Sequence, residues 1–344
     1  MPEISANKIC IIRLSALGDT VHTLGMINGL RRIYPEAHLA WILQPISYEL
    51  VKHQDNIDRF ILFDRSKGLK SWRKLAKDLN KEKFDLVLML QVSIKSSLIS
   101  TIVRGDVKLG FDFRRSREMH WMFANQRIPH RLTQHAQAQY LEFLDYLGLE
   151  DYSGEWNFRF TEQELAWRKD FFEELGRPAI SFVVATSNSH KDWHASGYAQ
   201  VMDYIDKNLD MQPMIVGGPG KQERAMAHEI CRLCESHPVV DLGDSLRQTM
   251  LQLSGSLIAV SPDTGPLHIA VALNVPTVSL FGYSNPRRCG PFNRFQDLLV
   301  DRFTDSGEEN IPITRATKKG RMALISPEEV IEKIELGLER YVRK

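Results

Sequence analysis

Short apolar runs of strand length alternate with helical segments along most of the chain, and this alternation constrains the fold more than any other feature. In the first half the expected strands cover residues 8–14, 38–43, 57–63 and 85–90. In the second half they cover residues 179–184, 213–216, 239–242, 257–260 and 276–280. Strands that alternate with helices predict a parallel, doubly wound sheet, so each half should form an α/β unit of its own.

The length of the chain also favours two domains, because 344 residues exceed the roughly 250–300 at which a single core stops growing. We expect an N-terminal domain over residues 1–160 and a second domain over residues 161–325. Ile331, Ile334 and Leu338 recur at helical spacing, which predicts that residues 326–344 form a C-terminal helix that packs back on the body.

Composition places the chain among ordinary globular proteins, with 43% hydrophobic and 25% charged residues. No run approaches the roughly 18 apolar residues of a membrane span, and the first residues lack a signal-peptide pattern, so we expect a cytoplasmic protein. Cys231 and Cys234 have the spacing of a redox or zinc motif. They lack a second Cys or His pair nearby, so we expect a structural role for both.

The net charge of +1 hides a basic region. Residues 59–131 carry 17 Lys and Arg against 7 Asp and Glu, a net charge of +10. A solvated face explains such an excess, and so does an anionic partner or a membrane surface. Residues 67–79 read as a basic amphipathic helix, with Leu69, Trp72, Leu75, Ala76 and Leu79 on one face and Lys70, Arg73, Lys74 and Lys77 on the other.

Residues 257–272 read as a buried strand that breaks into a polar turn and starts a helix. Asp263 or Thr264 can cap that helix, and Gly265 allows a ligand to approach closely. The free N–H groups and partial positive charge of a helix start suit phosphate, and His268 lies one turn further along. A capped turn with no ligand is the structural alternative.

Two further loops of the second half follow expected strands. Thr186 and Ser187 supply hydroxyls and Lys191 a cation, so this loop could hold a diphosphate from the opposite side; a plain surface lysine is the alternative. Residues 217–220 are glycine-rich but match neither the dinucleotide fingerprint nor a P-loop. Glu223 could accept hydrogen bonds from ribose or simply complement its helix N-terminus.

Asp19 is the carboxylate of the opening loop, residues 15–19, which feeds an expected helix over residues 20–34. A carboxylate there could take the proton of an acceptor hydroxyl during one in-line displacement. Its structural alternative is a helix N-terminal carboxylate that satisfies backbone N–H groups. His22 is a second candidate base or a packing residue. No His, Cys and Asp cluster has metal spacing.

Ligands of open α/β sheets bind outside the carboxyl ends of the strands. The sequence therefore predicts two Rossmann-like domains facing across a cleft lined by residues 15–19, 185–193, 217–223 and 261–268. We also expect residues 111–135, which mix arginine with aromatics, to form a loop-rich region near a site.

Residues 11–24, the Lys191-Asp192-Trp193 triplet and residues 261–270 together resemble glycosyltransferase family 9, the heptosyltransferases of lipopolysaccharide core synthesis. The resemblance spans nearly the whole chain, and residues 91–97 and 117–118 are most similar to the heptosyltransferase I group. It implies a GT-B fold and inverting transfer of L-glycero-D-manno-heptose from ADP-heptose to a Kdo of the inner core, with no required metal or other cofactor.

The resemblance also assigns residues. It implies Asp19 as catalytic base and Ser15, Gly18 and Arg117 on the acceptor side. On the donor side it implies Thr186, Ser187, Lys191, Glu223, Asp263, Thr264, Gly265 and His268. The sequence departs from the family pattern at His194, Asp244 and Tyr283-Ser284, which concern the base and sugar of the donor.

The partners implied are ADP-heptose, an anionic Kdo-lipid A acceptor and peripheral contact with the cytoplasmic face of the inner membrane, with no nucleic acid. Three alternatives stay open on the residues alone. They are a family member with another sugar nucleotide or acceptor, a sugar-nucleotide epimerase or hydrolase, and a sensor that binds the nucleotide without turnover.

Overall fold

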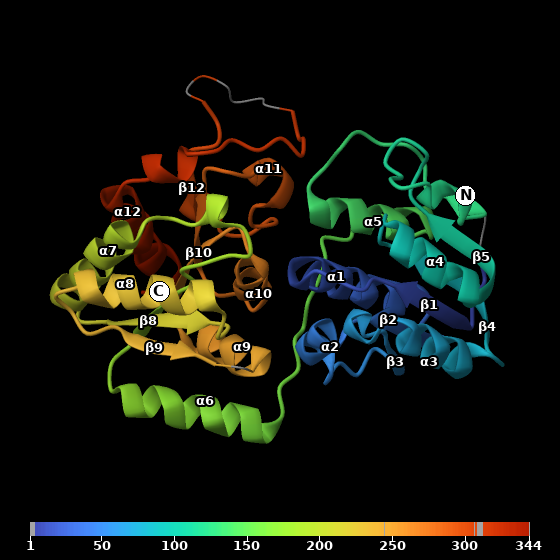
Figure 1. The fold of residues 1–344 in the computed structure, drawn as a ribbon, viewed down its shortest axis with the longest axis horizontal. Helices are drawn as coiled ribbons and strands as arrows, with labels where there is room; N and C mark the ends of the chain where they lie inside the picture. The colour runs from blue at the N-terminus through green and yellow to red at the C-terminus, as the bar shows by residue number, and fades with distance from the viewer. Residues whose placement is uncertain (1–3, 244, 306, 308–311, 344) are drawn as a thin grey trace. The chain divides into compact units, whose positions relative to one another are not determined.

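The structure is a computed structural model that describes residues 4–243, 245–305, 307 and 312–343 (Figure 1). The chain divides into two compact units, Met1–Arg159 and Phe160–Lys344. Each unit is built on one six-stranded sheet in which every strand pair is parallel.

Unit 1 alternates strands and helices from its first strand onward. Its strands are β1 (Lys8–Ile12), β2 (His38–Leu43), β3 (Arg59–Leu62), β4 (Lys83–Met89), β5 (Arg104–Gly110) and β6 (Gln126–Arg127). Its helices are α1 (Leu17–Ile33), α2 (Pro45–Val51), α3 (Leu69–Leu79), α4 (Ile94–Ile102) and α5 (Ala136–Tyr146), with short 3₁₀ turns η1 (Arg65–Lys67) and η2 (His120–Met122).

Unit 2 repeats the pattern. Its strands are β7 (Ala179–Phe182), β8 (Gln212–Gly217), β9 (Val239–Leu242), β10 (Ile258–Pro262), β11 (Thr277–Phe281) and β12 (Leu299–Asp301). Its helices are α6 (Glu162–Leu175), α7 (Ala195–Leu209), α8 (Lys221–Leu233), α9 (Leu246–Gly255), α10 (Gly265–Ala272), α11 (Pro286–Cys289) and α12 (Pro327–Gly337). Short turns are η3 (Ser189–Lys191), η4 (Gln296–Leu298) and η5 (Arg321–Leu324), and a π-helical turn η6 (Leu338–Val342) continues α12.

The two sheets have the same strand order. It is β3-β2-β1-β4-β5-β6 in unit 1 and β12-β11-β10-β7-β8-β9 in unit 2, which is the same order read from the other edge. This is the Rossmann order, in which the chain reverses direction across the sheet after its third strand. The switch point lies between β1 and β4 in unit 1 and between β7 and β10 in unit 2, and ligands of such sheets bind there.

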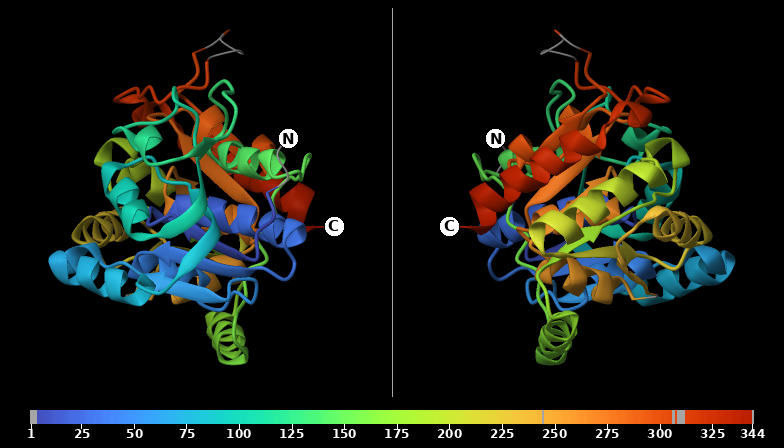
Figure 2. Two further views of the ribbon diagram at one scale, coloured as in Figure 1. Left: turned by 90° about the vertical axis from the view of Figure 1, so that its right-hand side faces the viewer. Right: turned by 90° about the vertical axis from the view of Figure 1, so that its left-hand side faces the viewer.

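Helices cover both faces of each sheet. In unit 1, α1 contacts α2 and α5, while α3 contacts α4. In unit 2, α7 contacts α8 and α12, while α9 contacts α6 and α10; α12 is the red helix in the right panel of Figure 2. Because both faces are covered, the central strands are buried on both sides and read as continuous apolar runs.

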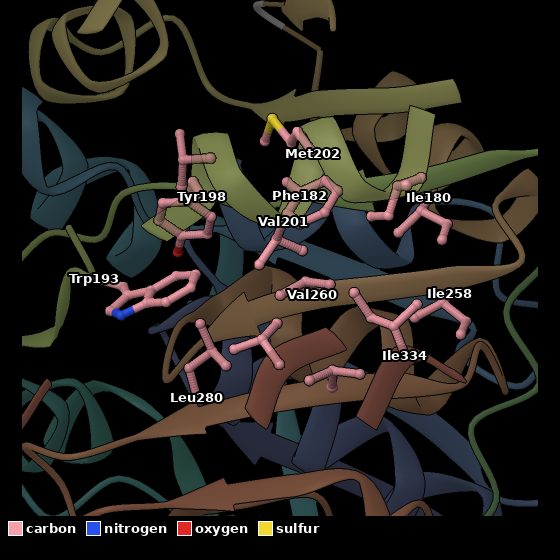
Figure 3. Close-up of a cluster of buried hydrophobic side chains, with 14 of the residues drawn as sticks. Ile180, Phe182, Trp193, Tyr198, Val201, Met202, Ile258, Val260, Leu280 and Ile334 are labelled. Carbon is pink, nitrogen blue, oxygen red and sulfur yellow. The ribbon is translucent and has the colours of Figure 1, made fainter. Parts of the chain in front are cut away.

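The core of unit 2 lies between its sheet and the layer formed by α7, α8 and α12. Figure 3 shows its centre, where Trp193 and Tyr198 pack beside the sheet residues Phe182 and Val260. Ile334 of α12 belongs to the same cluster, so the C-terminal helix completes this core. The Trp193 indole also donates to the carbonyl of Ile325, 3.0 Å away, which ties the start of α7 to the segment before α12.

Three strands, β5, β6 and β12, and the helices α2, α4, α6, α7, α9 and α11 are absent from the sequence predictions. β5 alternates polar and apolar residues near one edge of the sheet, so it lacks the continuous apolar run of the inner strands. The first helix also begins at Leu17 rather than Thr20, which places Gly18 and Asp19 inside its first turn.

The predicted apolar face of residues 67–79 is partly wrong. Leu75 and Leu79 are buried as expected, but Leu69 is 74% exposed, Ala76 is exposed, and Ser71 is buried instead. The buried stripe follows residues four apart, 71, 75 and 79. At about 100° per residue, Ala76 falls about 100° and Leu69 about 120° from its centre. The lysines of α3 are exposed as predicted.

Among the residues that the structure describes, no helix is long and apolar enough to cross a membrane.

Candidate functional site

At the switch point of unit 1, side-chain hydrogen bonds join the ends of the two central strands, β1 and β4. Just after β1, the backbone N–H of Leu14 donates to Oε1 of Gln91, 2.9 Å away. The Arg13 guanidinium donates through Nη1 to the carbonyl of Leu90, also at 2.9 Å. These two bonds fix the position at which the chain leaves β1 and enters α1.

Asp19 lies at this point, in the first turn of α1. Its Oδ2 accepts from the backbone N–H of Ala16 at 3.2 Å and forms an ion pair with Arg13. Its Oδ1 accepts from the Tyr140 hydroxyl of α5 at 3.1 Å. The Asp19 side chain is nevertheless 34% exposed, so the carboxylate is held in one orientation and is still open to a ligand.

Arg13 is a buried cation whose charge is matched by Asp19. Its guanidinium lies 5.4 Å from the centre of the Tyr140 ring. Burial acts to lower the pKa of Arg13, but the neighbouring Asp19 carboxylate and Tyr140 hydroxyl together raise that pKa by more, and the net direction is upward. Arg13 therefore stays charged and acts as a fixed partner for the carboxylate.

The other unit 1 candidates occupy different environments. His22 is buried, with Nδ1 2.7 Å from Oε1 of Gln137, which matches the packing alternative for this residue. Ser15 and Gly18 are partly exposed beside Asp19 in sequence. Arg117 is exposed in the coil after β5, and its side chain makes no hydrogen bond or ion pair within the described part of the chain.

The switch point of unit 2 carries a second ion pair. Lys191, at the end of η3, donates through Nζ to Oδ2 of Asp263 at 2.7 Å and to the Asp263 carbonyl at 3.2 Å. The loop after β7 is thereby joined to the turn after β10. The Asp263 side chain is 10% exposed and that of Lys191 is 27% exposed, so it is the cation that is open to a ligand.

The Asp263 carboxylate has further partners. Ser284 donates to Oδ2 at 2.6 Å, the Cys289 thiol lies 3.5 Å from the same oxygen, and His268 Nε2 lies 4.0 Å from Oδ1. Burial acts to raise the pKa of Asp263, but Lys191 and His268 lower it by more, so this pKa is below its usual range. Burial, helped by Asp263, raises the pKa of the Cys289 thiol to about 12, so that thiol stays protonated.

The predicted cap of α10 is wrong in its detail. Thr264 is the N-cap residue, but its side chain makes no cap hydrogen bond, and the Asp263 side chain is directed to Lys191. The backbone N–H groups at the start of α10 are therefore not satisfied by either side chain. Thr264, Gly265 and His268 are each partly exposed.

The remaining donor-side candidates differ in what their side chains do. The Thr186 hydroxyl donates to the Asn188 carbonyl at 2.8 Å and accepts from the Asn188 N–H at 3.1 Å, so it shapes its own loop. Ser187 is exposed. The Glu223 carboxylate lies over Gly220, the N-cap residue of α8, where a Cβ on the glycine would be 2.1 Å from Oε2. This contact matches the helix-terminus alternative for Glu223.

Several residues that hold the site escaped the sequence analysis. Arg13 could have been found, since it is a charge inside the apolar run of β1 and its loop. Tyr140 could not, because nothing in its own helix links it to Asp19. Ser284 follows β11, the neighbour of β10, and the Tyr283 ring stacks on the ring of His190 at 5.7 Å between centroids.

A pocket of about 580 Å³ in unit 2 lies beside these residues. Its wall comes from residues 189 and 192–195, from α8 and from Ala323. None of the predicted donor-side residues lines it, so it is a neighbouring feature and not the predicted site.

Residues 4–243, 245–305, 307 and 312–343 contain no group of three or more His, Cys, Asp or Glu that could hold a metal ion. All four cysteines are free, including Cys231 and Cys234. Asp244, where the sequence departs from the family pattern, lies outside the described residues.

Comparison with known proteins gives the family. The sequence model of glycosyltransferase family 9 (heptosyltransferase) matches residues 72–308. The lipopolysaccharide core heptosyltransferase OpsX of Haemophilus influenzae is 29% identical over 341 residues, covering 96% of this chain and 97% of the relative. This extent means that the similarity includes both units.

Solved structures agree on the fold. A family 9 glycosyl transferase from Veillonella parvula superposes with a TM-score of 0.84 at 24% identity, covering 97% of each chain. Escherichia coli heptosyltransferase WaaC, solved with ADP, gives a TM-score of 0.76 at 20% identity over 96% of this chain and 99% of WaaC. The same enzyme solved with ADP-2-deoxy-2-fluoro heptose gives 0.70 at 19% identity over the same shares of the two chains.

The fold class predicted from the sequence is confirmed, since both units are Rossmann-like and the chain has the α/β architecture of the GT-B enzymes. The family model covers more than half of the chain, and it spans parts of both units. The protein is therefore a glycosyltransferase and belongs to glycosyltransferase family 9, the heptosyltransferases.

Proposed function

We propose that this protein transfers L-glycero-D-manno-heptose from ADP-heptose to a Kdo residue of the lipopolysaccharide inner core, with inversion and with Asp19 as general base. One observation carries the proposal. Each unit has an ion pair at its switch point, and in unit 1 the exposed partner is the carboxylate, whereas in unit 2 it is the cation. A base and a diphosphate contact are the two groups that this reaction needs.

Asp19 suits the base. The acceptor hydroxyl oxygen attacks the anomeric carbon, the bond from that carbon to the ADP oxygen breaks, and Asp19 takes the hydroxyl proton. Arg13, Tyr140 and the Ala16 N–H hold the carboxylate in place before the reaction, which limits the reorganisation it requires.

Lys191 suits the leaving diphosphate. Two of the three ammonium hydrogens are engaged by Asp263, which leaves one to donate to a phosphate oxygen. The uncapped N–H groups at the start of α10 supply further donors, together with Thr264, Gly265 and His268. Ser187 adds an exposed hydroxyl on the loop after β7, while Thr186 supports that loop and Glu223 is proposed to reach the ribose.

The donor and acceptor follow from the relatives. WaaC was solved with ADP and with an ADP-heptose analogue, and OpsX is a lipopolysaccharide core heptosyltransferase. Ser15, Gly18 and Arg117 are proposed on the acceptor side. Kdo-lipid A is anionic and resides in a membrane, so we place the protein on the cytoplasmic face of the inner membrane, in keeping with the net charge of +10 over residues 59–131. No metal or other cofactor is assigned to the reaction.

The test is ADP release from ADP-heptose by the purified protein, with and without a deacylated Kdo-containing acceptor. Release should require the acceptor. Asp19→Asn should lower kcat by about 10²–10⁴, the usual contribution of a positioned base, and leave the donor KM near its wild-type value.

Tyr140→Phe is the matched control. It keeps the carboxylate and removes one of its hydrogen bonds, so kcat should fall by about tenfold at most, which corresponds to about 1.4 kcal/mol. Acceptor-independent ADP release would replace the proposal with a hydrolase or epimerase. Tight donor binding with no turnover would favour a sensor, and an active Asp19→Asn would remove the base from Asp19.

A further inference from the structure

Unit 1 exposes a group of large apolar side chains on α4 and on the coil between β5 and α5. We name as the loop patch Ile94 and Leu98 of α4 with Phe113, Met119 and Met122 of the coil, which are 40%, 42%, 63%, 57% and 56% exposed. Single exposed apolar residues are ordinary, but several on adjoining segments mark an interaction surface.

Two contacts hold the coil against α4, one of them buried and one at the surface. His120 of η2 is fully buried, with Nδ1 3.1 Å from the Ser97 hydroxyl of α4. The Glu118 carboxylate accepts from the Ile94 N–H, the first of α4, at 2.6 Å. The coil therefore runs along the first turns of α4, as can be followed in Figure 1, and Met119 and Met122 flank the residue that is anchored.

The aromatic part of the patch is also fixed. Phe113 packs on Trp121 of η2, with ring centroids 5.1 Å apart. Phe113 is thus linked to the turn that carries Met122, which restrains the aromatic part of the patch.

Unpaired cations adjoin two of these apolar residues in the sequence, Lys95 next to Ile94 and Arg114 next to Phe113. Lys95 and Arg114 are exposed, and neither side chain makes a hydrogen bond or ion pair within the residues that the structure describes. Their neighbour Arg115 is the opposite case, because its side chain is only 9% exposed and is paired with Asp112 and Glu142. Arg115 thus anchors the coil from inside, while Arg114 next to it is left to solvent.

We propose that the loop patch is the surface by which this protein docks on an anionic phospholipid bilayer. This inference rests on the proposed function in one respect, namely that the acceptor is a lipid. Apolar side chains that enter the headgroup region, combined with cations that meet anionic headgroups, are the two parts of an interfacial membrane contact. The patch supplies both at one place.

The basic helix α3 is the competing surface, and it lacks one of these parts. Its exposed side carries Lys70, Arg73, Lys74 and Lys77, but Leu69 is its one large apolar side chain that is mostly exposed. Leu75 and Leu79 are used by the core of unit 1. Helix α3 can therefore contribute charge attraction, but it has little apolar surface to insert.

The experiment is co-sedimentation of the full-length protein with vesicles of phosphatidylglycerol and phosphatidylcholine, without donor or acceptor. The apolar variant is Phe113→Ser with Met119→Asn and Met122→Ser, where Asn suits the positive φ of 58° at residue 119. The charge variant is Lys95→Ser with Arg114→Ser, and its matched control on α3 is Lys70→Ser with Lys74→Ser.

Wild-type protein should bind the anionic vesicles and not pure phosphatidylcholine. The charge variant should bind about 25-fold more weakly, because each of its two cations near an anionic surface contributes about fivefold. The apolar variant should lose at least tenfold, and the α3 control should lose less than the charge variant. Thermal unfolding of each variant within about 2 °C of wild type shows that the fold is intact.

Three results would overturn the inference. They are no vesicle binding by wild type, a loss in the α3 control that exceeds the loss in the charge variant, or a concentration-dependent dimer that the apolar variant abolishes. The last result would assign the patch to a second copy of the chain.

Transfer to the deacylated, water-soluble acceptor separates this inference from the proposed function. If the patch is a membrane contact only, both patch variants should keep wild-type transfer in that assay. Loss of vesicle binding with full transfer supports the docking surface, while vesicle binding without any transfer leaves the docking surface standing and refutes the transferase proposal.

Discussion

Replacing Asp263 by Asn should destabilise unit 2, because it leaves the Lys191 cation without its partner. The carboxylate now accepts from Lys191 at 2.7 Å and from Ser284 at 2.6 Å, and its side chain is 10% exposed. Asn keeps the volume and one acceptor oxygen but removes the charge. Removing one member of a fully buried ion pair costs about 3–5 kcal/mol.

The expected magnitude for Asp263→Asn is smaller than that limit. Lys191 is 27% exposed, so its ammonium can turn toward water once the carboxylate is gone, and its interaction with Asp263 is already screened in part. We therefore expect a loss of about 2 kcal/mol. Lys191→Met with Asp263→Asn removes both charges, and its loss should be smaller than the sum of the two single losses by at least about 1 kcal/mol.

Hydrogen exchange in increasing denaturant, followed peptide by peptide, is the assay. It reports β7 and β10 of unit 2 separately from β1 and β4 of unit 1, which matters because a chain of two units need not unfold in one step. Exchange in unit 1 should not change. If the losses in Lys191→Met and Asp263→Asn add up to the loss in the double variant within about 0.5 kcal/mol, the two side chains do not stabilise each other. An Asp263→Asn protein as stable as wild type would refute the ion-pair contribution as well.

The same pair predicts a pH dependence. The pKa of folded Asp263 is below its usual range despite burial, owing to Lys191 and His268. Its stabilising contribution is therefore complete above the unfolded pKa of about 3.9 and is lost as the pH falls through the lower folded value. The free energy of unfolding of wild type should fall more steeply below about pH 4 than that of Asp263→Asn; equal slopes would contradict this sign.

Two further changes test the packing of each unit. Burial lowers the pKa of His120 to about 4, so between about pH 6.5 and 4 the unfolded chain binds a proton that the folded chain does not. His120→Gln should therefore reduce the loss of unfolding free energy on acidification in this range by up to about 3 kcal/mol. An unchanged slope of unfolding free energy against pH would show that His120 is not responsible. Gly255→Ala would place a Cβ 2.1 Å from the Phe172 ring and should lower the free energy of unfolding in denaturant by about 1–3 kcal/mol. In the control Gly218→Ala the new Cβ meets no atom within 4 Å, so the loss should be less than about 1 kcal/mol.

The central strands were predictable because they are buried on both faces. His38–Leu43 has the predicted bounds, and β1, β4, β7, β8 and β10 differ from the prediction by one or two residues at an end. A fully buried strand needs apolar residues at every position, and this leaves a run that can be read without knowledge of its neighbours. The strand–loop–helix turns after β1 and β10 follow, since ligand-binding loops of this fold lie at the ends of such strands.

The contacts within each candidate site were not predictable in the same way. Tyr140 is 121 residues from Asp19, and Asp263 is 72 residues from Lys191. Periodicity and capping rules act over one or two turns. They therefore offered Asp263 or Thr264 as the helix cap, whereas the partner of Asp263 comes from another loop. The peripheral strands β5 and β12 were missed for a related reason, because short or partly exposed strands need few apolar residues.

The two units share one sheet topology, but their ion pairs suit opposite chemical uses. In unit 1 the side chain of the cation is 9% exposed and that of the carboxylate 34%; in unit 2 the carboxylate is 10% exposed and the cation 27%. Each buried partner fixes the position of the exposed one, so the pair presents a single charge at the switch point. Unit 1 presents a negative charge, which can accept a proton, and unit 2 a positive charge, which can meet a phosphate. The choice of which partner is buried, and not the fold, therefore decides what each unit can contribute to group transfer.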